Sequence, residues 1–258
     1  MRRFYFDKLQ IDAISIDETV SHVSRVMCLP RSHTHHIVTV NAQFVHTAHD
    51  EPRFANVIRR ADFSVADGVP LVWASRLLRQ PLPGRVNGTD LMIRLCQVAA
   101  TQGNTVYFLG GVPGAADAAA SVLQHQFHGL TIVGIDCPPF GFNQVPALDE
   151  EVCARIEQAQ PDLVLVALGA PKAEYWIQDH LHLPAKVMIG IGGSFELVAG
   201  YKKRAPLLLQ KIGCEWLWRL CMEPGRLWKR YLIGNSLFGY LLLKQMLFRD
   251  SARVSEFT

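Results

Sequence analysis

Six short apolar runs, separated by stretches long enough for helices, constrain the fold of this chain more than any other feature of its sequence. The runs are rich in β-branched residues and are apolar on both faces, which is typical of the buried strands of a parallel sheet. They cover residues 37–41, 63–66, 105–109, 131–135, 162–168 and 186–191. This alternation predicts an α/β fold, a Rossmann-like, mostly parallel sheet flanked by helices.

Three of the intervening stretches carry clear helix signals. Ser15 and Glu18 have the spacing of a capping box, in which each side chain bonds the other residue's backbone N–H. Residues 113–127 are rich in alanine with Pro113 at the start, and residues 148–160 have acidic side chains in the first turn. With 49% apolar and 19% charged residues, the composition excludes a disordered chain.

The charge of the chain changes sign near residue 200. Residues 1–200 carry 15 Lys and Arg against 19 Asp and Glu, whereas residues 201–258 carry 11 against 4. The sequence therefore predicts an α/β catalytic domain over 1–200 and a basic, amphipathic helical appendage over 201–258. Such an appendage suits an anionic surface, which is a membrane, a polyphosphate-bearing ligand or nucleic acid.

The appendage is expected to form two amphipathic helices that separate at Pro224 and Gly225. Arg219, Arg226 and Arg230 would share one face of a continuous helix, beside tryptophans that favour the lipid headgroup layer. The most apolar run, 231–243, is shorter than the roughly 20 residues that span a bilayer, so the appendage is predicted to lie on a membrane. A helical pair docked on the sheet with a solvated basic face is the alternative.

The amino-terminal stretch and the cysteines indicate the compartment. MRRFYFDKLQID has a basic start but no apolar segment of a secretory signal, so we expect a cytoplasmic protein. The six cysteines contain no C-x-x-C pair, which favours reduced, mostly buried thiols over a zinc site or a disulfide framework.

Ligands of an open α/β sheet bind at the carboxyl ends of the strands, so the residues that follow each run are the candidate site. Glycines at these turns allow backbone N–H groups to approach a diphosphate, although tight turns without a ligand would also use them. The candidates at the strand ends are Thr39, Asn41, Asp67, Gly110, Gly111, Gly192, Gly193 and Ser194.

Asp67 is the candidate general base, because a carboxylate at the end of an apolar strand can be partly desolvated. It could equally be the N-cap of the helix that follows, since Asp is a preferred cap. Asn41 could be a turn residue, and Thr39 could fill a strand position.

Several familiar sites are missing from the sequence. It has no G-x-G-x-x-G, P-loop or G-x-S-x-G motif, and no Asp-x-Asp to hold a divalent ion on a nucleotide-sugar diphosphate. His33, His35 and His36 have no acidic or cysteine partner nearby in sequence, so a polar loop is favoured over a metal site. No metal site is predicted.

A set of ordered blocks resembles a known family, the WecG/TagA/CpsF glycosyltransferases of bacterial surface-polysaccharide assembly. The blocks are TVNAQFV, ADFSVADGVPLVWASRLL, RVNGTDLM, YFLGGVPG, PDLVLVALGAPKAEYWI, IGIGGSFELVAGYKKRAP and CEWLWRLCMEPGRLWKR. They extend from about Val40 to Arg230 and are highly specific for the family.

The resemblance implies a metal-independent, inverting transferase that needs no cofactor. Its donor would be a UDP-sugar carrying N-acetylmannosamine, its uronic acid or glucose. Its acceptor would be a polyprenyl-diphosphate-linked saccharide at the cytoplasmic face of the inner membrane, in exopolysaccharide or other surface-polysaccharide synthesis.

The resemblance also implies roles for individual residues. Asp67 would be the general base, Thr39, Asn41 and Arg85 would line the substrate pocket, and the three tail arginines would cover the site and meet the lipid diphosphate. Lys172 and Glu174 belong to the block GAPKAE and count as substrate-binding candidates; Lys172 could help neutralise the departing diphosphate. Many members have glutamine where this chain has Ala173, which makes glucose a serious candidate beside N-acetylmannosamine.

Two other functions remain open from the sequence. A nucleotide-dependent oxidoreductase would use the same kind of sheet, although the dinucleotide fingerprint is missing. A non-catalytic membrane-surface module would explain the basic tail, whereas the acidic body and the lack of a reader motif argue against nucleic acid. The apolar tail helices could also form a homo-oligomer.

Overall fold

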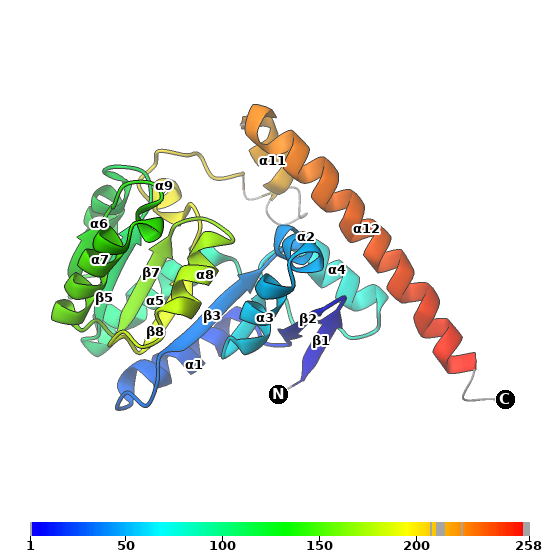
Figure 1. The fold of residues 1–258 in the computed structure, drawn as a ribbon, viewed down its shortest axis with the longest axis horizontal. Helices are drawn as coiled ribbons and strands as arrows, with labels where there is room; N and C mark the ends of the chain where they lie inside the picture. Colours follow the sequence, from blue (N-terminus) through cyan, green and yellow to red (C-terminus); the bar gives the residue numbers. More distant parts are fainter. Residues whose placement is uncertain (1, 207, 210–214, 223, 255–258) are drawn as a thin grey trace.

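The computed structural model describes residues 2–206, 208–209, 215–222 and 224–254. Its centre is a six-stranded parallel sheet with the order β4-β3-β8-β7-β5-β6 (Figure 1). The strands are β3 His35–Val40, β4 Phe63–Ala66, β5 Thr105–Gly110, β6 Thr131–Asp136, β7 Leu163–Ala167 and β8 Val187–Gly190. All six predicted strands are confirmed, each within two residues of its expected ends.

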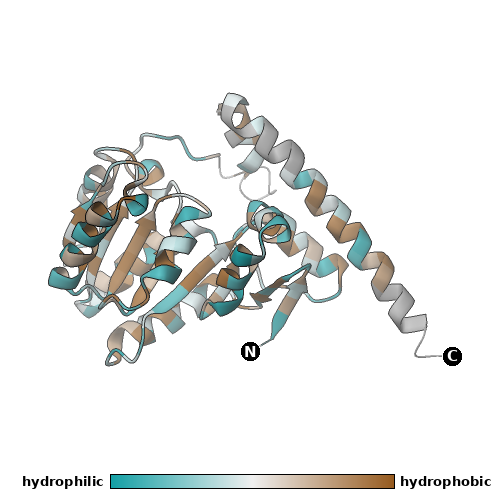
Figure 2. Ribbon diagram, viewed as in Figure 1, coloured by the Kyte–Doolittle hydropathy of each residue, from teal (hydrophilic) through white to brown (hydrophobic). Residues whose placement is uncertain are grey.

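Helices cover both faces of this sheet, which confirms the predicted fold class. One face packs against α1 Ile16–Cys28, α5 Gly88–Gln102, α6 Ala115–Gln126 and α9 Ser194–Val198. The opposite face packs against α2 Ala42–Asp50, α3 Pro52–Arg60, α4 Val69–Leu77, α7 Pro146–Ala159 and α8 Lys172–Asp179, with a short 3-10 turn at Phe142–Gln144. The strands are the most continuously apolar elements between these layers (Figure 2).

The predicted helix signals act as expected. Ser15 Oγ accepts from the backbone N–H of Glu18, and the Glu18 carboxylate accepts from the backbone N–H of Ser15, so both halves of the capping box are present. The alanine-rich run forms α6, and the run with an acidic start forms α7.

An amino-terminal hairpin was not predicted. Strands β1 Arg3–Phe6 and β2 Leu9–Asp12 pair antiparallel and bury the side chains of Phe4 and Phe6. Asp12 fastens the hairpin to the sheet, because its carboxylate accepts the backbone N–H of Ser64 in β4 at 3.0 Å. Each strand has only four residues, and charged residues interrupt both of them or the turn between them. The apolar alternation is therefore too short to predict a hairpin from the sequence.

The carboxyl-terminal part contains α11 Glu215–Met222 and α12 Pro224–Val254. Residue 223 between them lies outside the described residues, so the predicted separation at Pro224 and Gly225 stays a prediction. Helix α12 passes over α2 and the hairpin (Figure 1). Phe238 is buried 4.8 Å from the ring of Phe6, and Gln245 bonds the backbone of both Tyr5 and Asp7. One face of α12 is thus docked on the hairpin and α2, whereas the alternative interpretation placed a helical pair on the sheet. The division at residue 200 stays a prediction.

The side chains of Tyr240, Leu243 and Phe248 on α12 remain exposed. None of the helices in the described part of the chain combines the length and the apolar character needed to cross a bilayer.

The cysteines depart from expectation in one respect. All five that are described are free thiols, but Cys28, Cys137 and Cys221 are exposed and only Cys96 is fully buried. The prediction of mostly buried thiols is therefore wrong, because the helix ends and loops that carry them face solvent.

Candidate active site

The site lies where two neighbouring strands send the chain to opposite faces of the sheet. Strand β3 continues into α2 on one face, whereas β8 continues into α9 on the other. Divergence of this kind opens a crevice at the carboxyl ends of parallel strands, where ligands of such sheets bind. Thr39, Asn41 and the turn Gly192-Gly193-Ser194 all lie at this point.

Asp67 follows β4, next to β3, and is partly buried. Its backbone N–H donates to the carbonyl of Val40 at 2.7 Å, which continues the strand pairing by one residue. Helix α4 has Gly68 as its N-cap with no side-chain cap, so the N-cap interpretation of Asp67 is wrong. Gly68 has φ +142°, a backbone conformation that favours glycine, and this turns the chain sharply after Asp67.

Asn87 holds the Asp67 carboxylate. Its Oδ1 accepts from the backbone N–H groups of Thr89 and Asp90 and caps α5, so its Nδ2 must point the other way. Nδ2 donates to Asp67 Oδ1 at 3.2 Å. The helix cap therefore fixes the amide orientation and presents a donor to the carboxylate.

Thr39 and Asp67 meet beside Gly88, the first residue of α5. A methyl group at Gly88 would lie 3.6 Å from Thr39 Oγ1 and 3.9 Å from Asp67 Oδ2. Thr39 is buried within β3, so it does fill a strand position while its hydroxyl faces this point. Asn41 caps α2 through Oδ1, which accepts from Gln43 and Phe44, so it has the structural role that the sequence left open.

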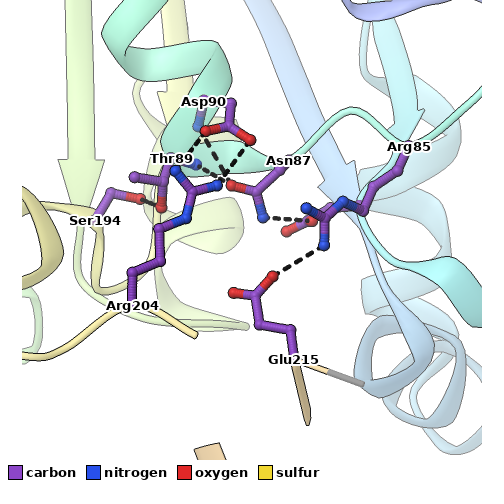
Figure 3. Close-up of polar contacts among 8 residues, drawn as sticks. Arg85, Asn87, Thr89, Asp90, Ser194, Arg204 and Glu215 are labelled. Atoms are coloured by element: carbon purple, nitrogen blue, oxygen red, sulfur yellow. Dashed lines mark hydrogen bonds and ion pairs between the residues drawn. The ribbon is translucent and has the colours of Figure 1, made fainter. Parts of the chain in front are cut away.

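Arg85 reaches the same edge from the segment before α5. The next residue, Val86, donates its N–H to the carbonyl of Ala66 at 2.7 Å, which places this segment alongside the end of β4. The Arg85 guanidinium forms an ion pair of 2.9 Å with Glu215 at the beginning of α11 (Figure 3). Both side chains are mostly buried, so the pair is shielded from water and salt.

A second ion pair fastens the chain that leads to α11. Arg204 forms a two-pronged contact with Asp90, at 2.7 and 2.8 Å, in the first turn of α5 (Figure 3). Beside it, Ser194 Oγ donates to the carbonyl of Ile191, so the Thr89 hydroxyl donates to Ser194 across 2.9 Å. Ser194 is thus buried and joins the β8 turn to α5.

The turns at the strand ends contain glycine for different physical reasons. Gly110 has φ +90°, and a Cβ there would lie 2.9 Å from the carbonyl oxygen of Ala167, so packing between β5 and β7 demands glycine. The Gly111 N–H already donates to that carbonyl at 3.0 Å, which leaves this N–H committed within the protein. Gly192 has φ +55° and open space around it, which a tight turn at the crevice explains.

Lys172 begins α8 at the carboxyl end of β7, and its ammonium lies 3.7 Å from the centre of the Phe140 ring. Glu174 is buried and packs directly against the backbone of Gly190. Burial raises the pKa of Glu174 to about 7. Ala173 is also buried and belongs to the core under the sheet, so the structure gives this position a packing role.

The side chains of Arg219, Arg226 and Arg230, which were predicted to share one helix face and meet the lipid diphosphate, lie outside the described residues. The polar-loop interpretation is wrong for His35 and His36, which lie in β3.

The histidines do have an acidic partner in space. Asp62 Oδ1 lies 2.9 Å from His33 Nε2 and 3.2 Å from His35 Nδ1. Parallel pairing brings this aspartate, almost 30 residues away, to the amino end of β3. That proximity depends on strand register, so sequence spacing could not reveal it.

Comparison of the sequence with known proteins shows the family of this chain. The family model described as "Glycosyl transferase WecG/TagA/CpsF family" matches residues 4–252. The chain belongs to this glycosyltransferase family. Relatives from Staphylococcus aureus strains MRSA252 and MW2 are 35% and 34% identical over 211 residues, which is 81% of this chain and 79% of each relative. Each is named N-acetylglucosaminyldiphosphoundecaprenol N-acetyl-beta-D-mannosaminyltransferase.

Membership in a transferase family replaces the oxidoreductase and non-catalytic alternatives. The candidate site also contains residues that the sequence analysis did not identify as site candidates: Asn87, Thr89, Asp90, Arg204 and Glu215. The N-G-T-D segment contained a signal for the first three, because Asn is a preferred N-cap and an acidic residue follows in the first turn. Nothing in the sequence pairs Glu215 with Arg85.

The buried carboxyl of Glu174 predicts a dependence of stability on pH. Because burial raises its folded pKa above the 4.5 of an exposed glutamate, the folded state holds a proton that the unfolded state releases between pH 4.5 and 7. The free energy of unfolding should therefore fall across this window, by about 3 kcal/mol. Urea denaturation from pH 5 to 8 should show Glu174→Gln gaining this amount relative to the wild type.

Glu151→Gln is the matched control, because this glutamate is exposed on α7. Its stability should follow that of the wild type at every pH. Parallel curves for the wild type and Glu174→Gln would show that the buried carboxyl does not titrate in this range.

Proposed function

We propose that this glycosyltransferase moves a sugar from a UDP-sugar to a saccharide linked to polyprenyl diphosphate, with inversion at the anomeric carbon. The observation that supports it best is the Asp67 carboxylate, which Asn87 holds beside Thr39 at the crevice between β3 and β8. The relatives' names state an acceptor of N-acetylglucosamine on diphosphoundecaprenol. A lipid-linked acceptor of this class is therefore proposed for this chain.

Asp67 is proposed to act as the general base. It would take the proton of the acceptor hydroxyl while that oxygen forms a bond to the anomeric carbon and the bond from this carbon to the UDP oxygen breaks. The hydrogen bond from Asn87 Nδ2 occupies one oxygen of the carboxylate and orients the other. Attack from the side opposite to UDP inverts the anomeric centre.

Arg85 is proposed to bind the diphosphate of a substrate. In this structure one oxygen of the Glu215 carboxylate pairs with its guanidinium, and a phosphate would offer two oxygens to the same guanidinium. Lys172 stands at the same edge of the sheet and can add positive charge for the leaving UDP. These cations would neutralise the leaving group without a metal ion.

The donor is proposed to be a UDP-hexose, with N-acetylmannosamine and glucose as the two candidates. The relatives transfer N-acetylmannosaminyl groups, as their names state. Ala173 faces the core, so its difference from the family's glutamine does not select between these sugars.

The appendage is proposed to hold the enzyme on the cytoplasmic face of the inner membrane. Two ion pairs, Arg85–Glu215 and Asp90–Arg204, fasten it over the crevice. Exposed apolar side chains continue along α12, among them Tyr240, Leu243 and Phe248. An acceptor that stays in the bilayer would meet the site at this side of the molecule.

A donor panel tests the reaction. UDP-glucose, UDP-N-acetylmannosamine and UDP-glucuronic acid are each supplied with membranes containing polyprenyl-diphosphate-linked saccharides and excess EDTA, and UDP release is measured. We expect acceptor-dependent release from one donor. Turnover that is lost in EDTA and restored by Mg²⁺ or Mn²⁺ would contradict metal independence, and transfer to water alone would contradict the acceptor.

Replacing Asp67 tests the base. Asp67→Asn keeps the side-chain volume but removes the proton acceptor, so kcat should fall about 100-fold or more. Asp179→Asn is the control, because its exposed ion pair with Arg53 lies away from the crevice. A stably folded Asp67→Asn enzyme with near-normal kcat would exclude Asp67 as the base.

The membrane role of α12 predicts a selective loss of vesicle binding. Replacing exposed Leu243 and Phe248 by glutamine removes two side chains that would enter the interface, so binding to anionic vesicles should weaken about ten-fold or more. The double variant Leu29→Gln/Val122→Gln alters exposed apolar residues of the body and should bind like the wild type. Equal weakening in both double variants would argue against an α12 interface.

A further inference from the structure

A second cluster of reactive side chains lies between α7 and α8, on the β5–β7 side of the sheet. Asp149 and Cys153 are one turn apart on α7, and His180 follows the last turn of α8. One ligand atom from each residue lies within 4.8 Å of the other two, and all three side chains are partly buried. Asp67 lies beyond β8 and β3, so this cluster is separate from the candidate active site.

The hydrogen bond from His180 Nδ1 leaves a lone pair on Nε2 that faces the Asp149 carboxylate. Its Nδ1 lies 2.7 Å from the backbone carbonyl of Trp176, which can only accept, so Nδ1 carries the proton. In a neutral imidazole, Nε2 is then an acceptor, and it lies 3.1 Å from Asp149 Oδ2. Two acceptors at this separation repel each other unless a second ring proton or a metal ion lies between them.

The same tryptophan holds the aspartate. Trp176 Nε1 donates to Asp149 Oδ1 at 2.8 Å, which leaves Oδ2 for a cation. The indole also stacks on the His180 ring, with centroids 4.5 Å apart. Metal-binding histidines and carboxylates are held in this way by an outer layer of hydrogen bonds, and here one buried residue supplies both.

The charges around Cys153 favour a dication. The carboxylates of Asp149 and Glu157 lie around the Cys153 side chain and make this surface negative, which attracts a divalent ion. A bound ion would displace the thiol proton of Cys153. Glu157 and His182 line the same surface cavity as the cluster.

We propose that Asp149, Cys153 and His180 bind one zinc ion, with His182 or water as the fourth ligand. Thiolate, imidazole and carboxylate are the ligands that Zn²⁺ takes in tetrahedral sites, whereas Mg²⁺ and Ca²⁺ favour oxygen alone. The ion would join α7 to the end of α8, the helix that begins with Lys172. Its role is to fasten this helix, and it takes no part in the transfer step.

Cobalt is the spectroscopic probe. Full-length protein treated with EDTA and dialysed is titrated with Co²⁺, and we expect one ion per chain with an intense near-ultraviolet band from a cobalt–thiolate bond. Cys153→Ser should lose this band, while Cys137→Ser, which alters an exposed cysteine elsewhere, should keep it. Zinc at about 100 times its dissociation constant should raise the melting temperature by about 5–10 °C in the wild type and not in Cys153→Ser.

Further variants make the test decisive. Asp149→Asn should weaken zinc binding measured by calorimetry, which covers the case in which Cys153→Ser fails to fold. A cobalt–thiolate band that survives in Cys153→Ser would assign the ion to a different cysteine and overturn the proposal. Metal binding that His33→Ala abolishes and Cys153→Ser does not would assign the ion to the His33–His35–Asp62 cluster and overturn it as well. No metal binding, with His180 doubly protonated in nuclear magnetic resonance spectra, would overturn it as well.

Discussion

The divergence of the chain after β3 and β8 toward opposite faces of the sheet is the constraint on which the rest of this structure depends. Two adjacent parallel strands end at the same edge, but their helices leave toward opposite faces. Backbone and side chains from several parts of the sequence therefore meet at that edge, and Glu215 of α11 reaches it as well. The turn after β4 brings Asp67 to this edge, and the segment before α5 brings Arg85 and Asn87.

The crevice is built from side chains that serve structure and site together. Asn87 caps a helix with one end of its amide and holds Asp67 with the other. The Thr89 hydroxyl donates to Ser194 and joins the β8 turn to α5, while the Ser194 hydroxyl donates to Ile191 within that turn. Because each polar group is already committed to a bond, the geometry is set before a substrate arrives, which is the condition for efficient positioning.

The appendage faces two environments. Phe238 and Leu241 are buried against the body, whereas Tyr240 and Leu243 on the same helix are exposed. The hairpin that receives α12 comes from the amino terminus, so the two ends of the chain stabilise each other through Gln245. Docking on the body and contact with a membrane are therefore compatible, because they use different faces of one helix.

The sequence by itself determined the sheet, most of its helices and the edge at which the candidate site lies, because strand and helix periodicity and capping residues act locally. It also indicated the family through ordered blocks. Only the tertiary structure decided which residues meet. The pairing of Arg85 with Glu215, of Asp62 with His33 and of Asp149 with His180 joins positions 130, 29 and 31 residues apart. Such contacts depend on strand order and helix packing, and neither is encoded in the spacing of residues along the chain.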